Sequence, residues 1–139
     1  MREFLCKGKR KKNGEWVTGH YQRRIHILDK IEHLIYHYES YEDWEYAEII
    51  PETCCQYSEL LDKDHNGIWE NDLVKEAWGD CIGIVQYGLH GKEFGWYIKW
   101  LSPKANGFRE DIPYWLNEIT VIGNLSVSQI AYLRLYLRN

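Results

Sequence analysis

Apolar and polar residues alternate in short runs along most of the chain, and residues typical of turns separate the runs. A strand with one buried face produces this two-residue period. The pattern predicts a hairpin within 4–22, then short strands at 24–28 and 33–38. In the second half it predicts strands at 73–78, 81–87, 94–101 and 119–123. We therefore expect a mainly β protein.

Two of the three Asn-Gly pairs in the chain, Asn13-Gly14 and Asn66-Gly67, mark predicted hairpin turns. Both residue types tolerate a positive φ, which a type I′ hairpin turn requires at its two central positions. In the first hairpin, the turn places residues 9–12 at the tip. In the second hairpin, we expect a type I′ turn with Gly67 at positive φ.

The segment before Gly67 also resembles the first half of an EF-hand calcium loop. Asp62, Asp64 and Asn66 have the spacing of the first three ligand positions of such a loop. The twelfth position, which needs a bidentate Glu, is Leu73. The flanking residues also lack the periodicity of helices, so a turn is favoured over a calcium site.

Three segments have less regular patterns. Residues 39–48 combine acidic and aromatic side chains and are expected to form an acidic loop, and the chain is expected to be extended again at 46–50, before Pro51. Pro51 favours one helical turn within 51–57, because proline fits the first turn of a helix. Near the C-terminus, alternating residues fit a strand, whereas Ser126 or Ser128 could cap a helix. The Leu, Ala, Gln and Arg content there favours the helix.

The predicted elements group into an N-terminal β-rich region at 1–59, a small barrel at 60–125 and a C-terminal tail at 126–139. Several short strands at regular spacing are typical of barrels and sandwiches, and we favour an SH3-like barrel. Seven Trp, eleven Tyr and three Phe supply an aromatic core. A chain of 139 residues can bury most of its apolar surface, so the regions are expected to form one compact unit.

The net charge of −4 hides an uneven distribution. Residues 1–24 hold eight Lys or Arg against two Glu, whereas the rest of the chain holds nine basic against nineteen acidic residues. A basic head of this kind can bind an anionic partner or the acidic surface of a second copy. Lys and Arg at a hairpin tip can equally keep a strand edge soluble. Five residues are the candidate contacts for nucleic acid or a protein partner: Lys9, Arg10, Lys11, Lys12 and Trp16.

The cysteines and the N-terminus indicate a cellular compartment. No CxxC pair occurs, and the adjacent Cys54 and Cys55 are hard to bridge to each other. Residues 1–10 are charged rather than apolar, and no apolar run approaches the roughly 20 residues that span a bilayer. We expect a cytoplasmic protein with no membrane partner.

No residue pattern specifies catalysis. The chain lacks a GxSxG motif and a phosphate-binding glycine loop. His33 and His37 have the spacing of helical zinc ligands, but their neighbours look extended, so ordinary surface positions are favoured. Glu52, Glu70 and Asp72 lie in the most distinctive segment, where roles in a helical turn, a strand edge and a loop explain them best. We therefore predict no catalytic residue, no metal ligand and no cofactor.

Three segments resemble the YopX family of phage and prophage proteins: GKRKKNGEWVTGHY at 8–21, IPET to DLV at 50–74, and ITVIGNL at 119–125. The resemblance implies a mainly β protein with an SH3-like C-terminal barrel, encoded by a bacteriophage or prophage, with no established catalytic residues. It also implies structural roles for the residues of the shared signature: Pro51, Glu52, Thr53, Gln56, Tyr57, Asn66, Gly67, Asp72, Gly123 and Asn124.

The chain departs from the family pattern at three places. Cys54-Cys55 stands where the family tends to have Val-Gly, Glu59 where it tends to have Gly, and Asn71 where Gly usually precedes the Asp. Asn adopts a positive φ readily, so the turn at Asn71 is expected to be kept. Cys55 and Glu59 adopt it less readily, so the resemblance does not specify the backbone between 53 and 60.

These features favour a non-enzymatic phage accessory protein that acts as an interaction module in the cytoplasm of the bacterial host. Its expected partner is a second copy of the chain, or another phage or host protein, because charge is asymmetric and aromatic residues are abundant. The alternative is a nucleic-acid-binding protein that uses the basic hairpin, since aromatic rings beside Lys and Arg bind single strands.

Overall fold

The computed structural model describes residues 5–25, 30–40 and 43–138. The chain divides into two compact units, Met1–Tyr57 and Ser58–Asn139. Antiparallel strands form most of each unit, so the prediction of a mainly β protein is confirmed. Within the described ranges, no helix is long and apolar enough to span a membrane.

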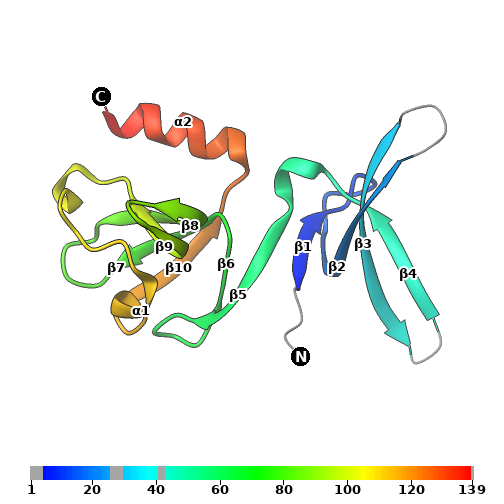
Figure 1. Cartoon of the computed structure of the whole chain (residues 1–139), viewed down its shortest axis with the longest axis horizontal. Coiled ribbons are helices and arrows are strands. Elements are labelled where there is room, and N and C mark those ends of the chain that lie inside the picture. Colours follow the sequence, from blue (N-terminus) through cyan, green and yellow to red (C-terminus); the bar gives the residue numbers. More distant parts are fainter. Residues whose placement is uncertain (1–4, 26–29, 41–42, 139) are drawn as a thin grey trace. The chain divides into compact units, whose positions relative to one another are not determined.

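The first unit is built on a meander of four antiparallel strands, in the spatial order β4-β3-β2-β1 (Figure 1). Their bounds are β1 Cys6–Lys9, β2 Trp16–Ile25, β3 Ile31–Ser40 and β4 Asp43–Glu48. The strand β5, Cys55–Leu61, pairs with β1 and continues into the second unit. The predicted first hairpin is therefore confirmed as β1 and β2.

The core of the first unit lies on one face of this sheet. Val17, Ile35 and Ile49 are buried together there. Gly19 allows the close approach of β2 and β3, because a Cβ at this position would lie 2.0 Å from the carbonyl oxygen of Tyr36. Glycine is therefore required at this point of the sheet.

One sequence prediction for the first unit is wrong, and another lies mostly outside the described ranges. Of the strand predicted at 24–28, Arg24 and Ile25 belong to the end of β2, and residues 26–28 lie outside the described ranges. The described part of the segment 39–48 is not a loop, because β3 extends to Ser40 and β4 covers Asp43–Glu48. Strand β4 is stabilised by pairs of side chains across β3 and β4, such as Tyr46 opposite Tyr36. Such pairs cannot be predicted from the composition of the segment alone.

The predicted helical turn after Pro51 is confirmed as a 3-10 turn, η1, at Pro51–Thr53. The Thr53 hydroxyl donates a hydrogen bond to the Ile50 carbonyl oxygen at 2.6 Å. It also accepts one from the Lys9 backbone N–H at 2.8 Å. These bonds fix η1 against the end of β1, which gives Thr53 a structural role.

The second unit contains a four-stranded antiparallel sheet in the order β10-β7-β8-β9. Its strands are β7 Asp72–Glu76, β8 Ile82–His90, β9 Glu93–Trp100 and β10 Ile119–Asn124, and the short β6 is Gly67–Trp69. Its helices are η2 Pro103–Ala105, α1 Ile112–Trp115 and α2 Val127–Arg138. The four strands predicted here are confirmed with shifted ends, and the SH3-like description stays a prediction.

The buried cluster of the second unit consists of Ile68, Val74, Val85, Ile98, Ile112, Trp115 and Ile119. Trp96 and Trp100 pack against this cluster from the same strand as Ile98. The alternation along β9 therefore places these three side chains on its core face.

The predicted type I′ turn at Asn66-Gly67 is wrong. The loop between β5 and β6 is longer, and its positive φ, 66°, belongs to His65, while Gly67 begins β6. The Asp62 carboxylate accepts hydrogen bonds from the backbone N–H groups of Asp64, at 2.9 Å, and Asn66, at 2.8 Å. An Asp that bonds the backbone ahead of it organises a loop, and this replaces the two-residue turn.

Two of the three departures from the family pattern lie at positions with a positive φ. Asn71 has a φ of 68°, as expected, and Glu59 has a φ of 67° inside β5. The Ser58 hydroxyl holds this irregular backbone, since it donates to the Ile68 carbonyl oxygen and accepts from the Leu60 N–H. Cys55 is buried and starts the strand without a positive φ.

The C-terminal helix is confirmed as α2, and Ser126 caps it rather than Ser128. The Gln129 N–H donates to the Ser126 hydroxyl at 3.3 Å. The Ser126 N–H donates to the side-chain oxygen of Gln129 at 2.8 Å. This reciprocal pair is a capping box, which satisfies two backbone donors at the start of a helix.

Candidate functional site

The basic residues of the first hairpin gather around Trp16. Gly8 and Val17 are buried, so strand alternation places Lys7, Lys9 and Trp16 on the opposite, outer face. The ammonium groups of Lys7 and Lys9 lie 4.7 and 5.4 Å from the centroid of a Trp16 ring. The indole is 40% exposed. The result is an accessible aromatic ring with two cations beside it.

The tip of this hairpin is held by turn chemistry. The Gly14 N–H donates to the Arg10 carbonyl oxygen at 2.9 Å, and Gly14 has a φ of 73°. The Asn13 side-chain oxygen accepts a hydrogen bond from the Glu15 N–H at 3.0 Å. Asn and Gly therefore order a loop whose exposed side chains include Lys11 and Lys12.

The tip also lies against the end of β4. The Lys11 N–H donates to the Glu48 carbonyl oxygen at 3.0 Å, and Arg10 forms an isolated β-bridge with Ile49. A hollow of about 560 Å³ opens between these two segments. It is lined by Arg10, Lys11, Lys12, Asn13, Tyr46, Ala47 and Glu48.

One carboxylate partly neutralises this hollow. The Lys11 ammonium lies 2.9 Å from Glu48. A surface ion pair of this kind contributes about 0–1 kcal/mol, so an incoming phosphate can replace Glu48 at small cost. Tyr46, on the opposite wall, is 54% exposed and offers a second ring.

The guanidinium of Arg24 lies over Tyr46. The Arg24 guanidinium is 5.1 Å from the Tyr46 ring and donates a hydrogen bond to Glu32 at 2.7 Å. This hydrogen bond raises the pKa of Arg24 above its ordinary value. The Tyr46 ring is also 5.7 Å from that of Tyr36. Aromatic rings and cations therefore continue from the hairpin tip across β2, β3 and β4.

The structure brings together all five candidate contacts predicted from the sequence, in one hairpin. Sequence reasoning missed Lys7, Arg24, Tyr36 and Tyr46. The alternation of Lys7 and Lys9 around Gly8 was the available signal for Lys7. Tyr46 was missed because the segment before it, where its strand begins, was assigned to a loop.

The signature residues of the second unit have structural contacts. The buried Asp72 carboxylate accepts hydrogen bonds from the Trp69 N–H at 2.7 Å and from the Asn124 amide at 2.8 Å. The Asn124 amide also donates to the Glu70 carbonyl oxygen at 3.0 Å. Gly123 lies at a register shift between β10 and β7. Together they fasten β10 to the start of β7.

The signature residues before the second unit lie in η1 and β5. Pro51 and Glu52 belong to η1, and both are exposed. Gln56 pairs with Cys6 across β1 and β5, and the Tyr57 N–H donates to the Leu5 carbonyl oxygen.

The Asp62 carboxylate is occupied by N–H donors. Besides Asp64 and Asn66, the Val121 N–H donates to it at 2.8 Å. Burial alone would raise the pKa of Asp62, but the backbone hydrogen bonds from Val121, Asn66 and Asp64 outweigh burial and lower it. In the described part of the chain, no group of three or more His, Cys, Asp or Glu side chains is arranged to hold a metal ion.

The two histidines considered as metal ligands lie in β3. His33 shares a hydrogen bond with the Tyr21 hydroxyl through its Nδ1, and their rings stack with centroids 5.9 Å apart. His37 is buried. They are therefore two residues of one strand rather than of a helix.

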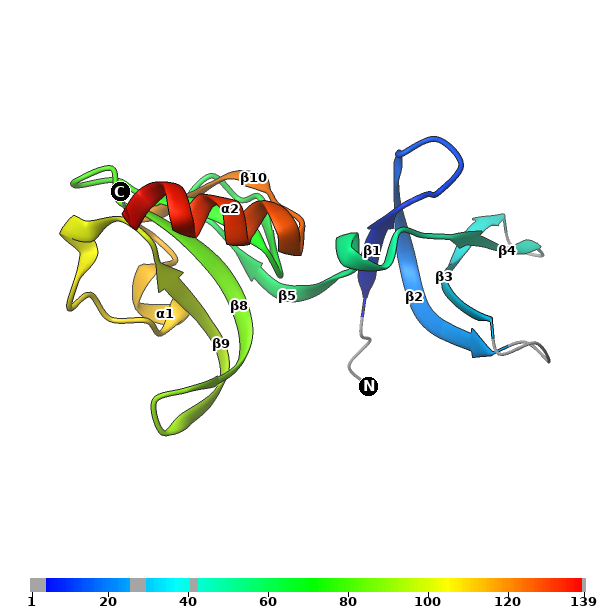
Figure 2. The same ribbon diagram turned by 90° about the horizontal axis from the view of Figure 1, so that it is seen from above.

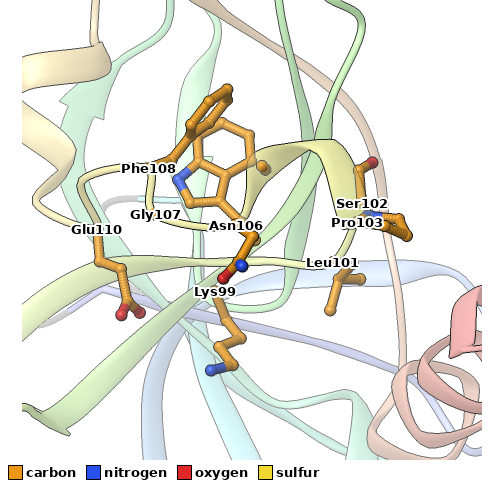
Figure 3. Close-up of a pocket in the computed structure, with 10 residues that line it drawn as sticks. Lys99, Leu101, Ser102, Pro103, Asn106, Gly107, Phe108 and Glu110 are labelled. Atoms are coloured by element: carbon orange, nitrogen blue, oxygen red, sulfur yellow. The ribbon is translucent and has the colours of Figure 1, made fainter.

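A second hollow, of about 500 Å³, lies beside the loop that follows β9 (Figure 3). Figure 3 shows the Lys99 and Glu110 side chains extending downward in the view, with the Phe108 ring above them. The Ser102 hydroxyl accepts a hydrogen bond from the Ile82 N–H at 2.9 Å. The Trp100 ring is fixed by its N–H, which donates to the Arg109 carbonyl oxygen. These contacts order the loop. They indicate a ligand less directly than the exposed ring and the cations of the basic hairpin do.

Comparison with models of protein families and with curated proteins finds no match to this chain. The similarity to the YopX family therefore stays a prediction that rests on the three sequence segments, and function has to be argued from the site.

Proposed function

We propose that the first unit binds single-stranded nucleic acid through the outer face of its basic hairpin. The observation that carries the proposal is the partly exposed Trp16 indole with the Lys7 and Lys9 ammonium groups beside it. Proteins that bind single strands combine aromatic rings, on which bases stack, with cations that follow the phosphates. Both elements occur here on one strand pair.

The charge of the hairpin supports an anionic ligand. Lys7, Lys9, Arg10, Lys11 and Lys12 give this hairpin five positive charges, and the nearby carboxylates include Glu15 and Glu48. Each phosphate bound by a Lys or Arg releases condensed counterions, which is the main source of affinity for nucleic acid. A polyanion therefore binds this surface more strongly than a single anion.

The rings favour a single strand over a duplex. Trp16 and Tyr46 offer ring surfaces, which can stack only on bases that are not already stacked in a helix. Base-aromatic stacking contributes about 1–3 kcal/mol per base by alanine substitution. Trp16→Ala should therefore weaken binding by about 5- to 150-fold.

Fluorescence anisotropy with a labelled oligothymidine tests this proposal. Trp16→Ala and the replacement of residues 9–12 by Ala should each weaken binding. A control replaces four exposed lysines of the second unit by Ala, at Lys63, Lys92, Lys99 and Lys104, and changes the net charge by the same amount. Equal losses in the control and in the hairpin variant would contradict a specific site, and no binding at low salt would reject the proposal.

A second candidate function is self-association through the hairpin of β8 and β9. These strands run side by side and curve together toward their connecting turn (Figure 2). Near the turn, Leu89 and Phe94 face each other and are 70% and 69% exposed. The Tyr87 ring lies 5.2 Å from that of Phe94 and extends the apolar surface. Exposed apolar surface of this kind marks interaction sites.

The proposed partner for this surface is a second copy, because the basic residues 1–24 and the acidic remainder of the chain attract each other between copies. Light scattering over a range of concentrations should show a mass above that of one chain. The double variant Leu89→Ser and Phe94→Ser should return the mass to that of a monomer. A monomeric parent at high concentration would exclude this candidate.

The cellular setting completes the proposal. The similarity of three segments to the YopX family supports a phage or prophage accessory protein that acts without catalysis in the bacterial cytoplasm. Recovery of nucleic acid with the tagged protein from induced lysogens, reduced by Trp16→Ala, would support that setting, whereas equal recovery would contradict it.

A further inference from the structure

A pocket of about 310 Å³ in the second unit combines four aromatic rings with two carboxylates. It is lined by Glu76, Trp78, Phe108, Tyr114, Trp115 and Glu118. These residues come from the end of β7, the turn before β8, the loop after η2, and α1 with the link to β10. The Ala77 N–H donates to the Glu118 carbonyl oxygen at 2.9 Å and joins the first of these segments to the last.

Three of the rings form a fixed wall. Phe108 and Trp115 stack with centroids 5.4 Å apart, and Tyr114 meets Trp115 edge to face at 5.1 Å. Trp115 is buried in the core, and its indole N–H donates to the Arg109 carbonyl oxygen at 2.7 Å. The wall is therefore held in place without a ligand.

The fourth ring stands at the rim. The Trp78 indole is 84% exposed, and its N–H donates to the Glu118 carboxylate. The Trp78 backbone N–H donates to the Glu76 carboxylate at 2.7 Å. Leaving so large an apolar side chain in water forgoes the stabilisation that its burial would give. The ring is thus oriented by hydrogen bonds but left uncovered, as expected of a ring that closes over a ligand.

Negative charge lines the pocket. Glu76 is buried, and its carboxylate accepts hydrogen bonds from the N–H groups of Trp78, Gly79 and Cys81. Burial alone would raise the pKa of Glu76, but these backbone hydrogen bonds outweigh burial and lower it, so the group is ionised at neutral pH. Among the described residues, no Lys or Arg nitrogen lies within 4.0 Å of the Glu76 or Glu118 carboxylates.

We propose that this pocket binds an alkylated ammonium ion, such as a trimethylammonium group. Aromatic faces attract cations within about 6 Å of the ring centroid, and recognition of quaternary ammonium by several rings is a general use of this attraction. An alkylated ammonium is weakly hydrated and has no N–H groups that must be satisfied, so it suits apolar walls better than a primary ammonium does. The two carboxylates supply the matching charge.

One neighbouring contact is an attraction of the same kind between a cation and a ring of the wall. The Arg109 guanidinium lies 4.4 Å from the centroid of the Tyr114 ring and pairs with Asp111 at 2.7 Å. This inference concerns the second unit and does not depend on nucleic-acid binding by the first, so each can fail without the other.

The test uses the full chain and two small probes of nearly the same shape. Choline carries a trimethylammonium group, and 3,3-dimethylbutan-1-ol is its neutral counterpart with carbon in place of nitrogen. Titration followed by chemical shifts of the indole N–H groups should show saturable binding of choline, and binding of the alcohol at least about threefold weaker. Absence of shifts with choline up to about 50 mM, or equal binding of the two probes, would overturn the proposal.

Two variants locate the site, and each has a matched control. Trp78→Leu and Glu118→Gln should each weaken choline binding by at least about threefold. Tyr132→Leu on α2 and Glu93→Gln in the β8–β9 hairpin change exposed residues of the same unit outside the pocket and should leave choline binding unchanged. Unchanged binding in both pocket variants would refute the assignment.

A further pair of probes distinguishes a free ligand from a side chain of a partner. Short peptides that carry trimethyl-lysine or unmodified lysine are titrated in the same way. Binding of choline with no gain from the peptide supports a free ligand, and tighter binding of the trimethylated peptide supports a modified side chain. Unmodified lysine that binds as well as both trimethylated probes would contradict the proposed chemistry.

Discussion

The backbone at Glu59 gives the sharpest test of how this sequence adapts to its fold. Glu59 lies inside β5, is exposed, and has a φ of 67°. A residue with a Cβ in the left-handed region costs about 1–2 kcal/mol, whereas glycine adopts this region without that cost. In a regular strand, glycine instead makes the protein about 0.5–1 kcal/mol less stable than alanine does, because glycine loses more conformational freedom on folding.

The comparison of Glu59→Ala with Glu59→Gly therefore separates the backbone from the side chain. Both variants remove the carboxylate, so their difference reports the backbone alone. We expect Glu59→Gly to be more stable than Glu59→Ala by about 0.5–1 kcal/mol in urea unfolding. At the exposed Lys75 of β7, which has no positive φ, the order should be reversed, with alanine more stable than glycine.

The result at Glu59 is decisive because the two hypotheses differ in sign. If β5 were regular at this position, alanine would be more stable than glycine at both sites. Finding Glu59→Ala more stable than Glu59→Gly would therefore refute the positive φ at this position.

Three further predictions follow from the buried polar groups, the helix cap and the packing of the first sheet. The pKa values of Asp62 and Glu76 are lowered from 3.8 and 4.5, so their contribution to stability is complete above about pH 5 and is lost as the pH falls through the folded-state pKa values. Glu76→Gln should therefore make the free energy of unfolding fall less steeply with decreasing pH below about pH 5, and an unchanged slope would contradict this. Ser126→Ala should lower stability by about 1 kcal/mol and speed amide exchange in the first turn of α2, whereas Ser128→Ala should change it by less than about 0.5 kcal/mol; equal effects would contradict the capping box. Gly19→Ala should destabilise the first unit by about 1–3 kcal/mol in chemical unfolding, because the added Cβ meets a carbonyl oxygen of β3, and a neutral effect would show that the sheet can open at this point.

Local sequence predicts the elements whose stability depends on nearby residues. The strands β7, β8, β9 and β10 alternate apolar and polar residues between clear turn residues, so their positions follow from the pattern. The capping box is equally local, since Ser126 and Gln129 are three residues apart. The basic hairpin could be predicted for the same reason, because its five candidate contacts lie within eight residues.

Contacts between distant segments explain what the sequence did not predict. Strand β4 depends on its pairing with β3, and its acidic and aromatic composition is typical of a loop. The loop after β5 depends on the Asp62 carboxylate, which also reaches the Val121 N–H of β10. The aromatic pocket combines residues from Glu76 to Glu118, and no spacing rule connects them. Such features depend on tertiary contacts rather than on local propensity.

The salt dependence of oligonucleotide binding tests the central claim most directly. If about three to five phosphates contact the basic hairpin, the slope of log K against log salt should be about −2 to −3.5 for a single strand. Replacement of residues 9–12 by Ala leaves Lys7 as the remaining lysine beside Trp16 and should make the slope shallower, between 0 and about −1. The four-lysine control of the second unit should keep the slope of the parent. The same slope in the parent and in the hairpin variant would contradict binding through this surface.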